Sequence, residues 1–314
     1  MKAIQISTFG CNDVLTYTEL AKPELNPGEV LIENKAAGVN PIDWKTCGGA
    51  GAAPFIGDLP FVPGWEFCGS IIEVAEDVSD YKPGDEVFGF IRFPEPAGCF
   101  AEYIAAPAAQ ISLRPESLPV TAAAGLGLAG LTAWQALFDK GNLQPSQQVV
   151  ILAAAGGVGH LAVQLAKWAG AHVIATASAA NHEYLKELGA DRVIDYQQKS
   201  MTDLVSGADL VIDGVGSERG IDALKCLKPG GILVTLPSAT KDAVIAAGEQ
   251  MKVQVAPIRV EPNSEQLAQL AKLCVERKLN VLVAGTFPLQ EAGKAFDSSR
   301  SGKTRGKLVL EIQS

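Results

Sequence analysis

The sequence has few of the residues that build metal sites, disulfide frameworks and membrane spans. Three histidines and six cysteines are spread over 314 residues, and no Cys-x-x-Cys pair occurs. This spacing fits neither a zinc site nor a disulfide framework, so buried or unreactive thiols are expected. The most apolar long stretch, residues 120–138, is mostly Ala and Gly with polar interruptions. It lacks the roughly 20 strongly apolar residues of a membrane span and is predicted to be buried helix and loop.

An excess of positive charge is also missing. The 26 Lys and Arg residues face 35 Asp and Glu residues, which gives a net charge of −9. Nucleic acids and anionic membranes bind basic faces, so neither is an expected partner. An anionic cofactor would have to be bound by groups at its own site rather than by the overall charge of the protein. The first seven residues, MKAIQIS, lack the apolar core of a signal peptide, which predicts a cytoplasmic location.

The composition and length are those of a globular protein with two domains. The sequence is 47% hydrophobic and 19% charged, and 314 residues exceed what one core usually serves. The first 110 residues or so contain short β-prone runs separated by Pro-Gly turns, which is typical of a small antiparallel β domain. These predicted strands are residues 29–33, 68–74, 86–91 and 100–104.

From about Gln147 the pattern changes to strands that alternate with helices, which predicts a parallel, doubly wound α/β sheet. The predicted strands are residues 149–152, 172–175, 192–195, 209–213 and 231–235, and the first helices are 158–168 and 181–188. A helix at 264–278, a helical run at 289–296 and a strand at 307–311 follow. We expect this tail to return to the N-terminal domain.

A small-residue loop directly follows the first strand of the alternating region. The run AAAGGVG at 153–159 is a variant of the dinucleotide fingerprint in which Ala153 stands for the first glycine. Small residues allow backbone N–H groups to approach a pyrophosphate, which also meets the positive end of the next helix. Four successive strand-helix units favour this interpretation over plain helix packing. The predicted contacts come from Ala155, Gly156, Gly157, Val158 and Gly159.

The end of the second strand favours NADP(H) over NAD(H). NAD enzymes place an acidic residue here against the ribose 2′-hydroxyl, but this sequence reads ATASAAN at 175–181. No carboxylate would repel a 2′-phosphate, and Thr176, Ser178 and Asn181 are able to donate hydrogen bonds to it. The lack of an acidic residue permits NADP(H) binding but does not require it. The alternative that Ser178 is simply a helix cap therefore stays open.

Several runs together resemble the medium-chain dehydrogenase/reductase superfamily, and within it the zinc-free quinone oxidoreductase and enone reductase group. They are AAGVNPIDWK at 36–45, FVPGWEFCG at 61–69, KPGDEV at 82–87, LAGLTAW at 128–134, GGVGHLAVQLA at 156–166 and RGKLVL at 305–310. The resemblance implies a GroES-like β domain of residues 1–122 with 285–314. A Rossmann doubly wound parallel sheet of residues 123–284 would bind the cofactor.

The resemblance also permits a check for catalytic zinc. Zinc-dependent members have a cysteine at the position of Asn40, a histidine at the position of Trp65, and a cysteine or histidine near Gly125. None of these three side chains is a zinc ligand, so a tetrahedral site cannot be built from them. The predicted enzyme therefore uses no metal.

Without zinc, hydrogen-bond donors must polarise the substrate carbonyl. Asn40 and Lys45 lie in the run that the family places beside the nicotinamide, and the resemblance implies that Lys45 protonates or binds substrate. Asp43 would orient the set. The alternative is structural: Asn40 and Pro41 make a turn, Asp43 caps a helix, and Lys45 is solvated.

The resemblance suggests further cofactor contacts. Thr132 would touch the nicotinamide or the phosphates, unless it is simply a buried helix hydroxyl, and Tyr196 would lie against the adenosine 2′-phosphate. Gly214 and Gly216 would let backbone pass close to the ribose. Two basic residues near the C-terminus could add positive charge, although such a turn is commonly just solvated: Lys303 and Arg305.

The sequence therefore predicts an NADPH-dependent reductase of quinones or α,β-unsaturated carbonyls, which are small conjugated substrates. The resemblance also implies a homodimer that covers the edges of the Rossmann sheet. Two alternatives stay open: a zinc-independent alcohol or aldehyde oxidoreductase, and a non-enzymatic NADPH-binding protein with a structural or interaction role.

Overall fold

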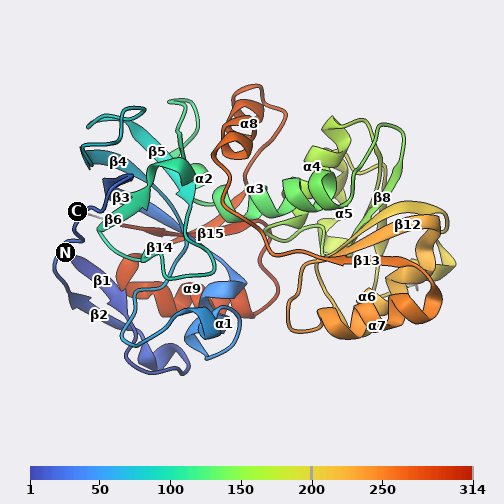
Figure 1. Cartoon of the computed structure of the whole chain (residues 1–314). Coiled ribbons are helices and arrows are strands. Elements are labelled where there is room, and N and C mark those ends of the chain that lie inside the picture. Colours follow the sequence, from blue (N-terminus) through green and yellow to red (C-terminus); the bar gives the residue numbers. More distant parts are fainter. Residues whose placement is uncertain (199–200, 313–314) are drawn as a thin grey trace. The chain divides into compact units, whose positions relative to one another are not determined.

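The chain folds into two compact units (Figure 1). The computed structural model describes residues 1–198 and 201–312. The first unit comprises Met1–Leu131, Glu261–Arg277 and Val281–Ser314, and the second Thr132–Val260 with Lys278–Asn280. The boundaries predicted from sequence, 1–122 with 285–314 and 123–284, differ from these mainly at helix α8 (Ser264–Val275). Helix α8 packs against strand β7 (Ile111–Leu113) and so belongs to the first unit.

The first unit is built on a sheet with the strand order β14-β15-β3-β4-β5-β7, in which β6 also pairs with β3. The two C-terminal strands join the N-terminal ones, and β15 runs antiparallel to β3. Besides β7, the strands of this unit are β1 (Lys2–Gln5), β2 (Thr16–Glu19), β3 (Glu29–Val39), β4 (Glu66–Val74), β5 (Glu86–Phe90), β6 (Tyr103–Pro107), β14 (Val283–Pro288) and β15 (Lys307–Glu311). The helices are α1 (Pro41–Cys47), α2 (Val120–Ala124), α3 (Gly127–Trp134), which begins in this unit, α8 and α9 (Ala292–Arg300).

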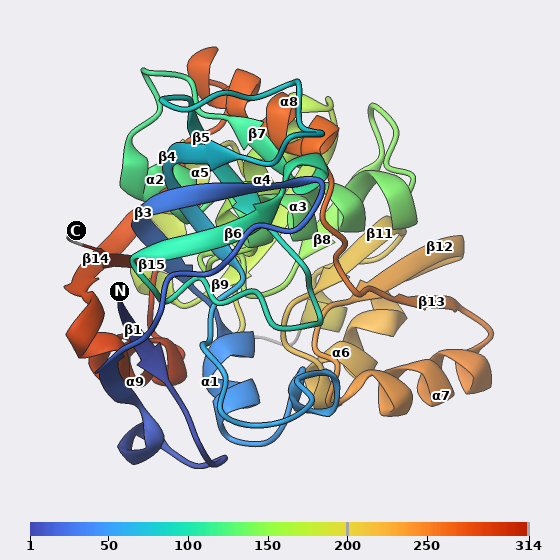
Figure 2. The same ribbon diagram turned by 60° about the vertical axis from the view of Figure 1, so that its left-hand side comes forward.

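Strand β3 is the centre of this sheet because strands lie along both of its edges. One edge pairs with β4, while β6 pairs with the first half of the other edge and β15 with the second half. Figure 2 shows β6 and β15 beside β3. Most of β3 is therefore buried, although its sequence includes charged residues.

One expectation for the first unit was wrong in detail. The strand predicted at 100–104 is β6 at Tyr103–Pro107, because Phe100 and Ala101 instead pair with β1 through Ile4 and Ala3. The strands within the first 110 residues pair antiparallel, as predicted, whereas β14 and β15 of the C-terminal tail run in the same direction.

The second unit confirms the predicted doubly wound parallel sheet. Its six strands are parallel in the order β10-β9-β8-β11-β12-β13. They are β8 (Gln148–Ile151), β9 (His172–Ala177), β10 (Arg192–Asp195), β11 (Ala208–Asp213), β12 (Leu227–Thr235) and β13 (Gln254–Pro257). The sequence did not reveal β13, a short edge strand with no fully buried residue.

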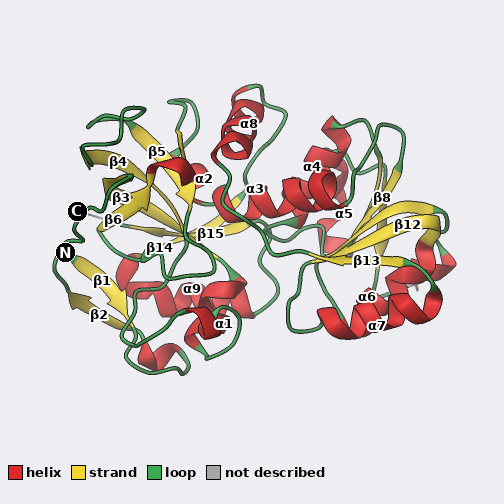
Figure 3. Ribbon diagram, viewed as in Figure 1, coloured by secondary structure: helices red, strands yellow, loops and turns green. Residues whose placement is uncertain are grey.

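Helices cover both faces of this parallel sheet (Figure 3). Helices α4 (Gly159–Trp168) and α5 (His182–Glu187) lie on one side, and α6 (Ser217–Ala223) and α7 (Lys241–Met251) on the other. Val150, Val211 and Leu233 of the sheet form a core with Leu224 and Val244 on the side of α6 and α7. The strand order reverses between β8 and β11, and in such sheets ligands bind at the carboxyl ends of the strands beside that point.

Candidate functional site

The small-residue loop after β8 leads into the N-terminus of α4, at the carboxyl edge of the parallel sheet. Gly156, Gly157 and Val158 are partly exposed there, and in the described residues the N–H groups of Gly157 and Val158 make no hydrogen bond. Gly159 is closely packed, since an added Cβ would lie 2.4 Å from the Ala153 carbonyl oxygen. The loop thus offers free donors and the positive end of a ten-residue helix, which fits a pyrophosphate.

The conformation of this loop is fixed by contacts with strand β9 and with the first turn of α4. Ala153 has a φ of +50°, the left-handed conformation for which the fingerprint normally supplies a glycine. The Ala154 N–H donates to the Thr176 carbonyl oxygen of β9 at 3.1 Å. The His160 ring is fully buried, and its Nδ1 lies 2.9 Å from the Gly156 carbonyl oxygen, which requires the proton on Nδ1. His160 is therefore a structural residue of the loop.

The residues predicted for the adenosine ribose lie at the ends of β9 and β10. Asp195 of β10 pairs with Ala177 of β9, so Tyr196 and Ser178 follow side by side in the register. The Ser178 hydroxyl accepts a hydrogen bond from Asn181 Nδ2 at 3.1 Å. The Thr176 side chain is buried, whereas Tyr196 is 40% exposed. Ser178, Asn181 and Tyr196 are thus the accessible members of the predicted group.

The turn after β11 depends on a residue that the sequence did not single out, Asp213. Its fully buried carboxylate accepts hydrogen bonds from the N–H groups of Val215 (2.9 Å) and Gly216 (2.7 Å), and from the Thr235 hydroxyl of β12 (2.9 Å). Gly216 has a φ of +71°, a conformation that favours glycine. Asp213 therefore holds the predicted Gly214–Gly216 segment at the carboxyl edge, beside the loop after β8.

In the first unit, Asn40 belongs to a buried polar cluster with Glu66 and Lys307. Asn40 Nδ2 donates to Glu66 Oε1 at 2.7 Å, and Lys307 Nζ donates to Asn40 Oδ1 and, at 2.9 Å, to Glu66 Oε1. The second carboxylate oxygen of Glu66 accepts the Leu128 N–H at 2.7 Å. Gly38 leaves room for this cluster, since an added Cβ would lie 2.1 Å from Glu66 Oε1. The orientation of the Asn40 amide is therefore fixed on both sides.

Asp43 lies beneath this cluster at the start of α1. One carboxylate oxygen accepts the Asn40 N–H at 2.6 Å, as in a helix cap, and the other has no partner among the described residues. Complete burial, helped by the neighbouring Glu66 carboxylate, outweighs the opposing effects of the Asn40 N–H and Lys307 and raises the pKa of Asp43 to about 8. The position supports the orienting role predicted for Asp43 and does not place it at an exposed surface.

Lys45 follows on the same helix and is half-buried. Its Nζ lies 5.4 Å from the centre of the Trp44 ring, and no described carboxylate pairs with it. Burial lowers the pKa of the Lys45 ammonium from its ordinary value of 10.5. Lys45 thus releases a proton more readily than a solvated lysine does, which is what the predicted role in protonation requires.

The positions that hold zinc in related enzymes contain packed side chains here. Trp65 is buried, donates from Nε1 to the Glu95 carbonyl oxygen at 2.7 Å, and packs edge-on against Phe93. Gly125 lies against the Lys307 side chain, whose Cβ would be 3.2 Å from an added Cβ. Among residues 1–198 and 201–312, no three His, Cys, Asp or Glu side chains are grouped as metal ligands would be.

The other predicted site residues are distributed over the two units. Thr132 is buried at the start of the second unit, while the exposed Lys303 and the half-buried Arg305 belong to the first. The missed residues Glu66 and Lys307 had a weak signal, since each is an ionisable residue at the start of a strand and is followed directly by buried apolar residues. No helix in the described part of the chain is long and apolar enough to cross a membrane.

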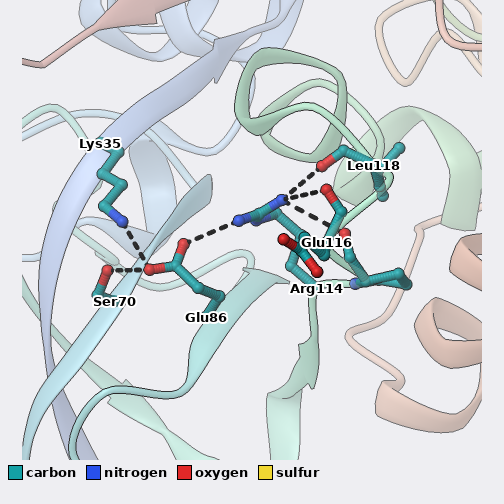
Figure 4. A network of polar contacts seen from close by, with 7 residues as sticks. Lys35, Ser70, Glu86, Arg114, Glu116 and Leu118 are labelled. Carbon is teal, nitrogen blue, oxygen red and sulfur yellow. Dashed lines mark hydrogen bonds and ion pairs between the residues drawn. The ribbon is translucent and has the colours of Figure 1, made fainter.

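A second charged network in the first unit has a structural role (Figure 4). Glu86 accepts hydrogen bonds from Lys35 (2.6 Å), the Ser70 hydroxyl and Arg114 (3.1 Å). Arg114 also donates to the Leu118 carbonyl oxygen at 2.7 Å. The network therefore ties β3, β4 and β5 to the segment that leads into α2.

Two family models match this chain. One is described as an alcohol dehydrogenase GroES-like domain and matches residues 26–116, and the other is described as a zinc-binding dehydrogenase and matches residues 188–310. The first match lies in the first unit and confirms the predicted GroES-like domain. The second covers the later part of the parallel sheet and the C-terminal strands.

Individual relatives match along the whole chain. A 2-methylene-furan-3-one reductase of Solanum lycopersicum is 34% identical, covering 99% of this chain and 79% of the relative. An NADPH-dependent alkenal/one oxidoreductase of the Arabidopsis thaliana chloroplast is 33% identical with the same coverage. The structure of a quinone oxidoreductase from Coxiella burnetii matches with a TM-score of 0.96 and 40% identity, covering 100% of this chain and 99% of that one.

Proposed function

Because the chain belongs to the zinc-free quinone oxidoreductase and enone reductase group of the medium-chain dehydrogenase/reductase superfamily, we propose that it is an NADPH-dependent reductase of quinones or α,β-unsaturated carbonyls. The observation that carries this proposal is the loop after β8, where free Gly157 and Val158 N–H groups meet the N-terminus of α4. The relatives named for enone, alkenal and quinone reduction support the substrate class.

The parallel sheet supplies the binding groups for the dinucleotide. The loop at Gly156–Gly159 takes the pyrophosphate, and Gly214–Gly216, held by Asp213, lets backbone lie close to the ribose. The end of β9 at Ser178 carries no carboxylate that would repel a 2′-phosphate. When bound, NADPH supplies the hydride that reduces the conjugated acceptor.

The first unit supplies the groups that handle negative charge and protons. Hydride addition to a conjugated carbonyl leaves an enolate or quinol anion that must be stabilised and protonated. The side-chain amide of Asn40 is held by Glu66 and Lys307, one Nδ2 hydrogen is not used by Glu66, and Asp43 accepts the Asn40 backbone N–H. Lys45, with its lowered pKa, is the proposed proton donor.

The test is acceptor-dependent oxidation of NADPH, followed by absorbance, with a panel of quinones, enones, aldehydes and ketones. Chelator-treated enzyme should oxidise NADPH with quinones or enones at the rate of untreated enzyme. Reduction of simple aldehydes or ketones alone would favour an alcohol or aldehyde oxidoreductase. NADPH binding without turnover of any acceptor would favour a structural or interaction role.

We also propose that the chain forms a homodimer through the edge of the parallel sheet. Strand β13 is an edge strand whose side chains are exposed or half-buried, and uncovered edges invite pairing. Light scattering at micromolar concentration should give a mass near twice 32.9 kDa. A monomer mass would rule the dimer out.

The cytoplasm is the proposed location, and nucleic acids and membranes are not proposed partners because the net charge is −9. One similar reductase is named as chloroplastic, so an organelle is the competing outcome. Cell fractionation with antibody detection distinguishes the two locations.

A further inference from the structure

Arg219 is a basic residue of the second unit that contacts the predicted cofactor site and pairs with no acid within the described residues. Lys167, Lys186, Lys225 and Lys228 each form an ion pair with a nearby carboxylate. Arg219, near the start of α6, makes no ion pair or hydrogen bond within the described residues, and its side chain is exposed. Its five N–H donors are therefore free to meet an acceptor from outside the chain.

Within the described residues, the guanidinium of Arg219 lies over the ring of Tyr196, a residue of the predicted cofactor site. Its guanidinium carbon lies 4.3 Å from the centre of the Tyr196 ring, at the distance of a cation–π contact. Tyr196 directly follows β10, and its hydroxyl has no partner in the described part of the chain. Contact with the ring restrains the guanidinium group, so less conformational entropy is lost when it binds a ligand.

The register of the sheet places this pair beside Ser178. Because Asp195 pairs with Ala177, Tyr196 follows β10 where Ser178 follows β9. These three groups are a planar guanidinium, a phenol and a serine hydroxyl, and no carboxylate of the described residues is bound to the guanidinium. Such a set is suited to binding a phosphate monoester. The carboxylate that directly precedes Tyr196, Asp195, already accepts hydrogen bonds from the Gln197 N–H at 2.9 Å and from Gln198 Nε2 at 3.0 Å.

We propose that Arg219, stacked on Tyr196, binds the 2′-phosphate of the dinucleotide and sets the preference for NADPH over NADH. This inference rests on the proposed function for the identity of the cofactor, but not for the identity of the acceptor. It supplies the positive charge that the sequence between β9 and α5 lacks. Arg219 acts as a binding residue for the phosphate and takes no part in hydride transfer.

The test is calorimetric titration of NADPH, NADH and 2′,5′-ADP into the wild-type protein and variants, without any acceptor. Arg219→Ala should weaken the binding of NADPH and 2′,5′-ADP by about ten- to hundredfold and that of NADH by less than twofold. Arg219→Lys should lose less, because the charge remains without the planar fork. Lys225→Ala is the matched control, since it removes an exposed charge of the same sign nearby and should change neither affinity.

Raising the salt concentration should weaken NADPH binding more in the wild type than in Arg219→Ala, because the lost contact is between opposite charges. Equal weakening of NADPH and NADH in Arg219→Ala, or no weakening of either, overturns the proposal. Wild-type protein that binds both cofactors equally also overturns it. If NADPH binding depends on Arg219 but no quinone or enone is reduced, the proposed function fails while this inference stands.

Discussion

The buried pair of Glu66 and Lys307 should be among the most sensitive sites of the fold. Glu66 is fully buried and the Lys307 side chain is 2% exposed, so neither charge is solvated. Lys307→Met removes the ammonium while Glu66 keeps its two N–H donors, from Asn40 and Leu128. An uncompensated buried carboxylate typically costs about 3–5 kcal/mol, and we expect that loss in the free energy of unfolding.

A double-mutant cycle with Glu66→Gln separates this loss from ordinary packing defects. Removing both charges leaves no unpaired ion, so the double variant should be more stable than the sum of the single losses predicts, by about 1–3 kcal/mol. The surface pair Lys186–Glu183, whose side chains are 58% and 84% exposed, is the control. Its removal should cost less than about 1 kcal/mol.

The assay is urea unfolding at pH 7, followed by tryptophan fluorescence. Trp44 and Trp65 lie in the unit that contains the pair. Single losses that add within about 0.5 kcal/mol in the double variant would refute the argument, because independent sites behave in that way. A loss for Lys307→Met no larger than that for Lys186→Met would refute it equally.

Three further predictions concern cofactor choice and pH. Ser178→Asp should weaken NADPH binding by about thirty- to a hundredfold and NADH binding much less, because a carboxylate beside Ser178 would repel the 2′-phosphate; equal weakening in binding titrations would mean that Ser178 is simply a helix cap. The pKa of Asp43 is raised to about 8, so the folded protein holds a proton there that the unfolded chain releases above its ordinary pKa of 3.8, and stability falls as pH rises through that window. Residue 43 cannot ionise in Asp43→Asn, so the variant serves as the reference. The free energy of unfolding of the wild type, minus that of the variant, should fall by about 1.4 kcal/mol per pH unit between pH 5 and pH 7 and level off above pH 8. A difference that does not change with pH contradicts this. Burial alone would raise the pKa of Glu86, but hydrogen bonds from Lys35, Ser70 and Arg114 hold it below its ordinary value of 4.5. The stability that the Glu86 carboxylate contributes is therefore present above pH 4.5 and lost as pH falls below it. Glu86→Gln should lower the free energy of unfolding by about 1–2 kcal/mol at pH 7 and by progressively less in unfolding experiments at acid pH. An equal loss at pH 3 and pH 7 would count against the network.

The sequence by itself determined the parallel sheet and its binding loop, because both are encoded over short stretches of chain. Apolar strand runs such as residues 149–152 and 209–213 can be recognised locally. The loop at Ala153–Gly159 requires small residues at fixed spacing, and the six runs between residues 36 and 310 together indicated the family. The short edge strand β13 escaped notice because it has no buried side chain to produce a pattern.

The tertiary structure alone decided which charged and polar groups meet. Glu66 and Lys307 are 241 residues apart in sequence, and Asn40 contacts both only because β15 and β4 lie on opposite edges of β3. Asp213 supports the turn at Gly216 through a bond to Thr235 on the neighbouring strand. Arg219 and Tyr196 belong to different strand-helix units, and no local pattern links them. Sequence periodicity reports which face of an element is buried, whereas the partner of a buried charge depends on how distant elements pack, and that is set by the whole sheet.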